Sequence, residues 1–395
     1  MDITIILNEA YPHGMAATNR IHLYARRFLE RGHNVEIIIP RPTERHDTNP
    51  LNFDIKGEYE GIKFRYPVSP VRSKSFIKRR INDFVSFFNT LDYIIWKKHN
   101  SDILLIVDNR WYMIVTYKIF CLLFNVKFVL EISEFPFVFV VKGGVYKIYR
   151  KLYVKYIFRL FNGLIVISDS LFEYFEKKIS KSAKQIIVPI ITNINNFQHT
   201  PDNSGEIVYT GALNQFKDGI MDLLKGYTIF NKKTPGKKLV LMGDLNVSPD
   251  KDEVVAFINK NKMKNNIEIT GYVDRQVMIQ RMSNAAVLAL AKPMNKQSEH
   301  CFPTKIAEYL STGKPVLTTI TGSIPQYLTD RKDSYLTDPN DPEHLAETLS
   351  DIFSDYQNAE IIGKNGRVLA LNEFDYSKQV DRILSFFDEL IERKK

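Results

Sequence analysis

The chain has 395 residues, more than the roughly 100 to 200 residues of a typical domain, so its length predicts two domains. Hydrophobic residues make up 44% and charged residues 25%, a balance that excludes a collagen-like chain and argues against intrinsic disorder. Cys121 and Cys301 are too few for a disulfide framework or a structural zinc site, and we expect no metal.

The formal net charge of +9 is confined to the first half of the chain. Residues 1–200 contain 29 basic and 18 acidic side chains, whereas the remainder contains 25 and 27. This asymmetry predicts that the first half meets a polyanion, either an anionic membrane surface or a nucleic acid. General solubility is the alternative reading of such a charge imbalance.

The sequence predicts a cytoplasmic protein. Residues 1–9 lack a basic leader, and their apolar run is too short for a signal peptide. The longest nearly apolar stretch, 111–126, is interrupted by Lys118 and is shorter than the roughly 18 residues of a membrane span. We expect this stretch to form a buried helix between two strands.

Short β-branched runs alternate with longer helical patterns, which is typical of α/β folds with parallel sheets. In the first half the expected strands are 3–7, 35–39, 103–107, 127–130, 164–167 and 186–188. In the second half they are 207–209, 239–242, 267–270, 287–290 and 316–318. We expect two doubly wound domains, 1–195 and 205–375, facing each other across a cleft at the carboxyl edges of their sheets.

Residues 192–205 have the polar composition of a linker and lack an apolar period. The domain boundary is therefore expected there. The final segment, 376–395, places apolar side chains on one helical face, and we expect this helix to pack back on the first domain.

Several motifs are absent from the sequence: G-x-G-x-x-G after the first strand, G-x-x-x-x-G-K-[ST], H-E-x-x-H and G-x-S-x-G. Their absence argues against dehydrogenases, P-loop enzymes, zinc peptidases and α/β-hydrolases. The turn at 11–20 contains Gly14, where the backbone can approach an anionic ligand before the first helix. An ordinary strand-to-helix turn is the alternative.

A second turn, at 298–316, also suits an anion. Pro303 fits the first turn of a helix, and that helix brings Lys305, Glu308 and Tyr309 within a turn of one another. A phosphate can bind the open amides near Thr304, while Glu308 can accept hydrogen bonds from ribose hydroxyls.

Residues 302–316 resemble the donor-site signature of the retaining GT-B glycosyltransferases of group 1, also called family 4. The segments 209–219, 241–244 and 269–273 resemble successive strand ends of that family. The resemblance covers nearly the whole chain and is strongest at 207–336. It implies two Rossmann-like domains, a nucleotide-sugar donor bound by the C-terminal one, and no obligatory metal or other cofactor.

The resemblance also implies site residues. Lys217 would neutralise the donor diphosphate, Glu308 would hold the ribose, and the backbone near Val273 would contact the base. His300 stands where the family has its first Glu, next to Glu299, and with Lys217 these are the candidate catalytic residues. The donor-binding set is Gly14, Gly211, Lys217, Gly243, Val273, Phe302, Pro303, Thr304, Lys305 and Glu308.

The acceptor side differs from the family, because no histidine matches the one near its reaction centre. The segment 130–136 stands at that strand end, which leaves Glu131 and Glu134, with His13, as acceptor-side candidates. A carboxylate at a strand end can also simply cap the following helix.

These features predict a glycosyltransferase that moves a sugar from a nucleoside diphosphate, UDP rather than GDP, to a glycan acceptor in cell-surface polysaccharide biosynthesis, with retention of configuration. Two alternatives are a GT-B-fold sugar-nucleotide epimerase and a non-enzymatic polyanion-binding protein. Recognition elements for nucleic acid are not evident in the sequence, so we expect no such partner.

The segments 72–98 and 142–161 alternate basic and aromatic residues over helical lengths. This composition is typical of a helix at a membrane interface. We therefore expect the protein to associate peripherally with the inner face of the cell membrane and to reach a lipid-linked acceptor there. The alternative is that the aromatic residues form core and the charges a solvated face.

Overall fold

The computed structural model describes residues 1–46, 50–136, 144–198, 200, 203–300 and 302–392. The chain divides into two compact units. Unit 1 comprises Met1–Pro189 and Tyr376–Lys395, and unit 2 comprises Ile190–Asp375.

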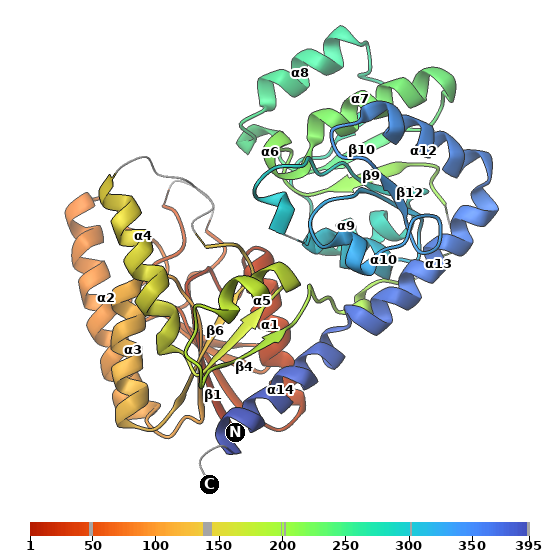
Figure 1. Cartoon of the computed structure of the whole chain (residues 1–395). Helices are drawn as coiled ribbons and strands as arrows, with labels where there is room; N and C mark the ends of the chain where they lie inside the picture. Colours follow the sequence, from red (N-terminus) through yellow and green to blue (C-terminus); the bar gives the residue numbers. More distant parts are fainter. Residues whose placement is uncertain (47–49, 137–143, 199, 201–202, 301, 393–395) are drawn as a thin grey trace. The chain divides into compact units, whose positions relative to one another are not determined.

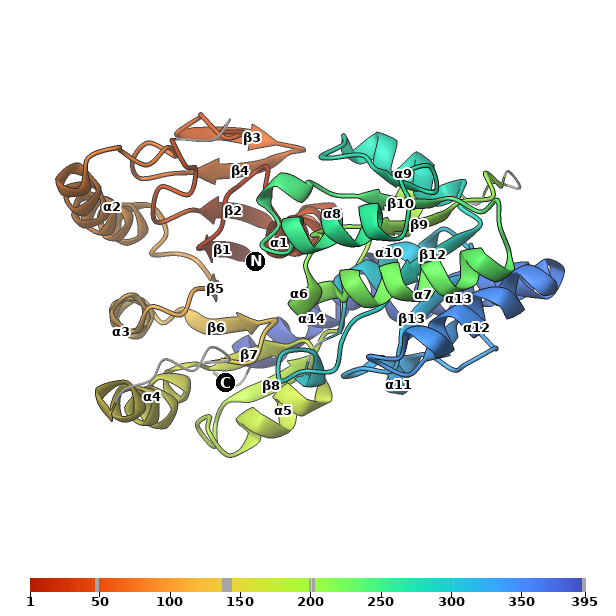
Figure 2. The same cartoon turned by 90° about the horizontal axis from the view of Figure 1, so that it is seen from above.

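Unit 1 (Figure 1) is built on a sheet with the strand order β3-β4-β2-β1-β5-β6-β7-β8, which can be followed in Figure 2. Its strands pair in parallel except β3, which is antiparallel to β4. The strands are β1 (Asp2–Leu7), β2 (Asn34–Ile38), β3 (Lys56–Tyr59), β4 (Ile62–Arg65), β5 (Ile103–Val107), β6 (Lys127–Ile132), β7 (Gly163–Val166) and β8 (Lys184–Ile187). The helices are α1 (Ala16–Glu30), α2 (Phe76–Lys97), α3 (Trp111–Leu123), α4 (Gly144–Tyr156), α5 (Asp169–Glu176) and α14 (Tyr376–Glu392).

Unit 2 is built on a parallel sheet with the order β11-β10-β9-β12-β13-β14. Its strands are β9 (Ile207–Thr210), β10 (Leu239–Met242), β11 (Ile267–Ile269), β12 (Val287–Leu290), β13 (Val316–Thr319) and β14 (Tyr335–Thr337). Its helices are α6 (Gln215–Asp218), α7 (Ile220–Lys233), α8 (Lys251–Lys260), α9 (Arg275–Ser283), α10 (Thr304–Ser311), α11 (Ile324–Tyr327), α12 (Pro342–Ser354) and α13 (Tyr356–Glu373). Strands β9, β10, β12 and β13 are fully buried, as expected of parallel strands covered on both faces.

The segment expected as a linker packs on unit 2. The Thr192 amide donates to the Phe374 carbonyl at 2.9 Å, and the Arg367 guanidinium donates to the Phe197 carbonyl at 2.8 Å. Ile194 and Phe197 are buried. The boundary therefore falls at Pro189, upstream of the predicted one, because these apolar side chains in an otherwise polar stretch belong to a core.

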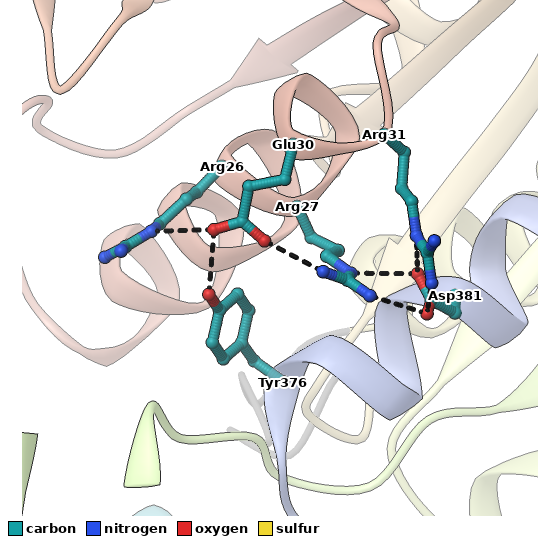
Figure 3. A network of polar contacts seen from close by, with 6 residues as sticks. All are labelled: Arg26, Arg27, Glu30, Arg31, Tyr376 and Asp381. Carbon is teal, nitrogen blue, oxygen red and sulfur yellow. Dashed lines mark hydrogen bonds and ion pairs between the residues drawn. The ribbon is translucent and has the colours of Figure 1, made fainter. Parts of the chain in front are cut away.

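Helix α14 packs on α1 within unit 1. The Phe28 and Phe387 rings lie 5.7 Å apart. Beside them, Arg27 binds both carboxylate oxygens of Asp381, at 2.9 and 2.8 Å, and Arg31 binds the same carboxylate (Figure 3). The Tyr376 hydroxyl donates to Glu30 at 2.9 Å. Apolar packing and a shared ion network thus join two segments at opposite ends of the chain.

The prediction of a buried helix at 111–126 is wrong in part. Helix α3 does lie between β5 and β6, but it buries only one side, including Met113 and Tyr117. Leu122 and Leu123 are 68% and 74% exposed. The helix is apolar all round, so its sequence pattern could not tell a core helix from a surface helix with an uncovered apolar side.

Candidate functional site

The turns after β9 and β10 pack tightly against each other. The Gly211 amide donates to the Met242 carbonyl at 2.9 Å, and Gly211 has a φ of +130°. A Cβ atom on Gly243 would lie 2.1 Å from the Gly211 carbonyl oxygen. Glycine at position 243 is therefore required by the close approach of the two turns, whereas glycine at position 211 is favoured by its positive φ. Both lie at the carboxyl edge of this sheet.

Lys305 reaches from α10 to the turn after β9. Its Nζ atom lies 2.7 Å from Asp218 Oδ2 and 3.4 Å from the Tyr209 hydroxyl. A Cβ atom on Gly211 would lie 2.6 Å from this Nζ, so the ammonium rests against a position where only glycine fits. Lys305 and Asp218 are largely buried, and the buried Tyr209 hydroxyl donates to Asp218 at 2.9 Å.

The first turn of α10 carries donor-site candidates. Pro303 is the N-cap residue, one position earlier than predicted, and no side chain caps the helix. The start of the helix thus presents backbone amides without a capping side chain near the exposed Thr304, as an anion requires. Phe302 is buried, with its ring 5.3 Å from that of Tyr327 and 5.4 Å from that of Phe374, so its side chain anchors the turn from within.

Glu308 lies one turn further along α10. Its carboxylate pairs with Arg275 at 2.7 Å, and both side chains are partly exposed. Arg275 begins α9, immediately after the turn that contains Val273, which is half-buried. The predicted ribose contact and the predicted base contact therefore belong to neighbouring elements of unit 2.

Lys217 lies in the short helix α6 and is exposed. Its amide is capped by Asn214 Oδ1 at 2.8 Å, and its carbonyl accepts from the buried Lys292 Nζ at 2.9 Å. The backbone of Lys217 is thus fixed from two sides, while its side chain extends from the surface. Lys292 lies two residues after the end of β12 and was not identified from the sequence.

The remaining catalytic candidates form a 3-10 turn, Ser298–His300, ahead of α10. Glu299 is exposed, and its amide donates to the Asn295 carbonyl at 2.9 Å. The backbone of His300 belongs to the turn, whereas its side chain and all of Cys301 lie outside the described part of the chain.

In unit 1, the turn before α1 is closed by its own contacts. A Cβ atom on Gly14 would lie 2.2 Å from Thr18 Oγ1, which donates to the Ala10 carbonyl at 2.7 Å. The His13 amide donates to Asn52 at 2.9 Å, and the His13 ring meets that of Tyr59 edge-on at 5.4 Å. Glycine at position 14 therefore has a structural explanation independent of any ligand.

Glu131 is held in a buried ion pair. Its carboxylate accepts from Arg20 Nε at 2.8 Å and from the Ser133 hydroxyl at 2.6 Å. The other guanidinium nitrogens of Arg20 donate to the Val188 and Pro189 carbonyls at 2.7 and 2.6 Å. The pair is satisfied as buried charges require, and Arg20 was not identified from the sequence.

Glu134 is exposed and belongs to a charged group at the carboxyl edge of the first sheet. Partial desolvation raises the pKa of Glu9, which follows β1; Arg41 opposes this shift and Glu134 adds to it. Arg41 lies in the segment after β2. Sequence analysis missed both residues. The position of Glu9 just beyond the buried strand β1 could have indicated it, whereas Arg41 lies further from the end of its strand.

One cluster among the described residues has the composition of a metal site: ligand atoms of Asp338, Asp341 and His344 lie within 4.8 Å of one another. His344 Nδ1 lies 3.0 Å from Asp338, and Asp341 caps α12 by accepting from the His344 amide at 2.9 Å. These groups are engaged in forming the start of α12. Among the same residues, no helix has the length and apolar character that crossing a membrane requires.

Residues 191–369 match the family model described as Glycosyl transferases group 1. The second unit is a group 1 glycosyl transferase domain. The match covers every strand of unit 2 and both Lys305 and Glu308.

Solved structures extend the comparison to the whole length of the chain. A sucrose-phosphate synthase from Thermosynechococcus elongatus superimposes with a TM-score of 0.77 at 15% identity and covers 100% of both chains. The HepE protein of Anabaena, solved with UDP, gives a TM-score of 0.73 at 15% identity over 98% of this chain and 100% of that one. The chain therefore has the GT-B fold, with two Rossmann-like domains.

A curated relative matches over a short segment only. Trehalose phosphorylase from Pleurotus pulmonarius is 30% identical over 110 residues, which are 26% of this chain and 14% of that protein. The resemblance inferred from residues 302–316 is confirmed for residues 191–369 by the family model, and the GT-B fold is confirmed by the solved structures.

Proposed function

We propose that the protein transfers a sugar from a UDP-sugar to a lipid-linked glycan acceptor in cell-surface polysaccharide biosynthesis, with retention of the anomeric configuration. One observation carries the proposal: within a group 1 domain, the ammonium of Lys305 in α10 lies against Gly211, just after β9, and the start of α10 lacks a capping side chain. This edge of an open α/β sheet is where such folds bind ligands.

The proposed roles of the site residues follow from the charge that develops on the leaving diphosphate. Breaking the bond between the anomeric carbon and the diphosphate leaves negative charge on the diphosphate. Lys305, Lys217 and the amides near Thr304 would stabilise that charge, and a preorganised group of this kind is worth about a hundredfold or more in rate. Because these groups are cationic or polar donors, the proposed mechanism needs no metal.

Two further parts of the proposal have their own support. The HepE structures include complexes with UDP and with UDP-glucose, which favours UDP as the nucleotide here. Retention rests on the resemblance of residues 302–316 to the retaining enzymes. Glu299 and His300 would then face the donor sugar, and Glu131, Glu134 and His13 would lie on the acceptor side.

Exposed apolar side chains on three helices support a membrane-bound acceptor. Helices α2, α3 and α4 stand side by side in both views of unit 1 (Figures 1 and 2), and the Phe87 and Tyr112 rings join α2 to α3 at 6.2 Å. Ile77 is 70% exposed on α2, and Val145 is 84% exposed on α4. Large uncovered apolar surfaces of this kind mark interaction sites.

The charges of the same helices suit an anionic bilayer. Helix α4 carries four basic and no acidic side chains, at Lys147, Arg150, Lys151 and Lys155. Each basic group near an acidic surface contributes roughly 1 kcal/mol before screening by salt. We infer that this face of unit 1 docks on the inner leaflet of the cell membrane, where a lipid-linked acceptor is presented.

A donor screen tests the enzymatic proposal. Purified protein is titrated calorimetrically with UDP- and GDP-sugars, and turnover is followed with and without a lipid-linked acceptor. We expect one UDP-sugar to bind best and to be consumed when acceptor is present, with a product of unchanged anomeric configuration by NMR. Consumption or rearrangement of the donor at the same rate without acceptor would indicate an epimerase or hydrolase instead.

A further inference from the structure

A small cavity in unit 1 lies beside the start of α2. Its volume is about 140 Å³, the space of four or five water molecules at about 30 Å³ each. It is lined by Arg41, Pro42, Arg72, Ser73, Arg79, Asn82 and Asp83. Three guanidinium groups and one carboxylate therefore surround a space large enough for a phosphoryl group.

The arginines come from three parts of unit 1. Arg41 lies in the segment between β2 and β3, Arg72 in the segment between β4 and α2, and Arg79 in the first turn of α2. Arg41 Nε is buried and has no hydrogen-bond partner among the residues that the structure describes. Because a buried charged donor is costly to leave unpaired, this atom indicates a ligand that accepts hydrogen bonds.

The other lining charges leave the cavity positive. Arg72 Nε donates to the Pro42 carbonyl at 3.2 Å, which holds its guanidinium at the cavity wall. Asp83 is half-exposed and lies 3.8 Å from Arg80, outside the lining, so its charge is partly neutralised.

The electrostatic environment of Arg41 agrees with this arrangement. Burial lowers its pKa, and the neighbouring Arg110 and Arg72 lower it further, while Asp108 and Glu9 oppose them. Like charges thus crowd a partly buried position, and a bound anion would relieve that repulsion.

We propose that this cavity binds the phosphomonoester or diphosphate headgroup of an amphiphile whose apolar chain lies on α2. Three planar guanidinium groups match the geometry and the double charge of a phosphoryl group better than those of a carboxylate. Phe76 and Ile77, in the same first turn as Arg79, are 61% and 70% exposed and give the chain an apolar surface. This inference rests on the proposed function, since the amphiphile would be the lipid carrier of the acceptor.

Vesicle binding with a matched pair of variants tests the cavity. The vesicles are phosphatidylcholine with either phosphatidic acid, which displays a phosphomonoester, or phosphatidylserine at equal total charge. The double variant Arg72→Gln, Arg79→Gln removes two charges from the cavity wall. The control Lys78→Gln, Lys97→Gln removes two exposed charges from α2, the helix that also carries Arg79, but none from the cavity.

We expect the wild type and the control to prefer phosphatidic acid, and the cavity variant to lose that preference by about tenfold or more, because charge-assisted hydrogen bonds are lost. Arg41→Lys should weaken the preference for phosphatidic acid although the positive charge is kept. A lysine ammonium cannot reproduce the planar set of N–H donors that a guanidinium presents to a phosphoryl group. Thermal melting verifies that each variant is folded. Equal losses in the cavity variant and the control, or no preference in the wild type, would overturn the proposal.

Inorganic pyrophosphate separates the headgroup from the chain. Calorimetry should show weak binding to the wild type and none to the cavity variant. If pyrophosphate competed as well as the amphiphile at equal phosphoryl concentration, the assignment to an amphiphile would be wrong. Binding of the UDP-sugar donor is measured on the same variants and should be unchanged, so a failed cavity remains distinguishable from a failed glycosyltransferase.

Discussion

The Nζ atom of Lys305 lies 2.7 Å from the carboxylate of Asp218, the last residue of α6. This pair holds the ammonium in place in the absence of any ligand, with the Tyr209 hydroxyl donating to the same carboxylate. A cation fixed in this way needs little reorganisation when negative charge develops on a leaving diphosphate. The pair therefore suits a group that stabilises a transition state.

Lys305→Gln should lower kcat/KM for donor and acceptor by about a hundredfold, because one preorganised cation is removed. The control is Lys296→Gln, an exposed lysine of the same domain, which should leave turnover unchanged. Initial rates with the preferred UDP-sugar measure both. Similar rates for the two variants would place Lys305 outside the reaction.

Glu308→Ala should weaken donor binding by about tenfold or more, because the ribose hydroxyls lose a charged acceptor. The variant also breaks the ion pair with Arg275, and Arg275→Ala breaks the same pair while keeping the carboxylate. An exposed ion pair contributes little to stability, so Arg275→Ala should bind the donor nearly as well as the wild type. Calorimetric titration of both variants with the donor measures the two affinities. Equal losses of donor affinity in Glu308→Ala and Arg275→Ala would assign the effect to the ion pair.

Much of this site could be predicted from the sequence because its residues are close in the chain. Lys305 and Glu308 share one helix, and the turn residues Pro303 and Thr304 precede them directly. The Arg41 cavity could not be predicted, because residues 41–42 and 72–83 are distant in the sequence and meet only in the folded unit. Neither Arg41 nor Arg72 has a local pattern that separates it from a surface arginine.

The strands of the fold also divide into those that the sequence predicts and those that it does not. Buried strands such as β5 and β10 have the predicted bounds, since continuous β-branched and aliphatic runs identify them. The hairpin of β3 and β4 was missed, because Lys56–Tyr59 is polar and mostly exposed at the sheet edge. Edge strands carry little of the apolar signal that sequence analysis uses.

Turnover should survive chelation. The proposed diphosphate contacts are Lys305, Lys217 and backbone amides, which neutralise charge as a divalent ion would. Activity is compared before and after treatment with EDTA, and again after addition of Mg²⁺ or Mn²⁺. Loss of activity with EDTA and its return with a metal would contradict this mechanism and direct attention to carboxylates such as Asp338 and Asp341.

Asp381→Asn should destabilise unit 1 by about 1 to 2 kcal/mol at neutral pH, because Arg27 and Arg31 lose a shared carboxylate (Figure 3). The hydrogen bonds from Arg31 and Arg27 hold the pKa of Asp381 well below its usual range. The carboxylate therefore contributes stability above its unfolded pKa of about 3.9, and this contribution is lost as the pH falls below that value.

Urea unfolding of the wild type and the variant across this acidic range measures the difference. The variant should lose less stability on acidification than the wild type, since it lacks this titrating group. Asp388→Asn, an exposed position on the same helix, is the control and should behave like the wild type. Equal pH dependence of the wild type and Asp381→Asn would mean that the network does not stabilise the fold.

Binding to acidic vesicles should depend on both charge and apolar surface in unit 1. Sedimentation with vesicles should require acidic lipid, weaken with salt, and fall when Lys78, Arg79 and Arg80 are changed together to Glu, because basic groups are attracted to the bilayer.

The apolar contribution to vesicle binding is tested by changing three exposed side chains to Ser. These are Ile77, Phe84 and Leu123, which are 70%, 65% and 74% exposed. This variant should bind about tenfold more weakly even at low salt, since burial of a large apolar side chain contributes about 1.5 to 3 kcal/mol when complete. Changing Val247, Ile361 and Val368 to Ser removes similar exposed side chains from unit 2 and should have no effect. If both triple Ser variants sedimented like the wild type, α2 and α3 would not contact the bilayer, and the acceptor would have to reach the enzyme from solution.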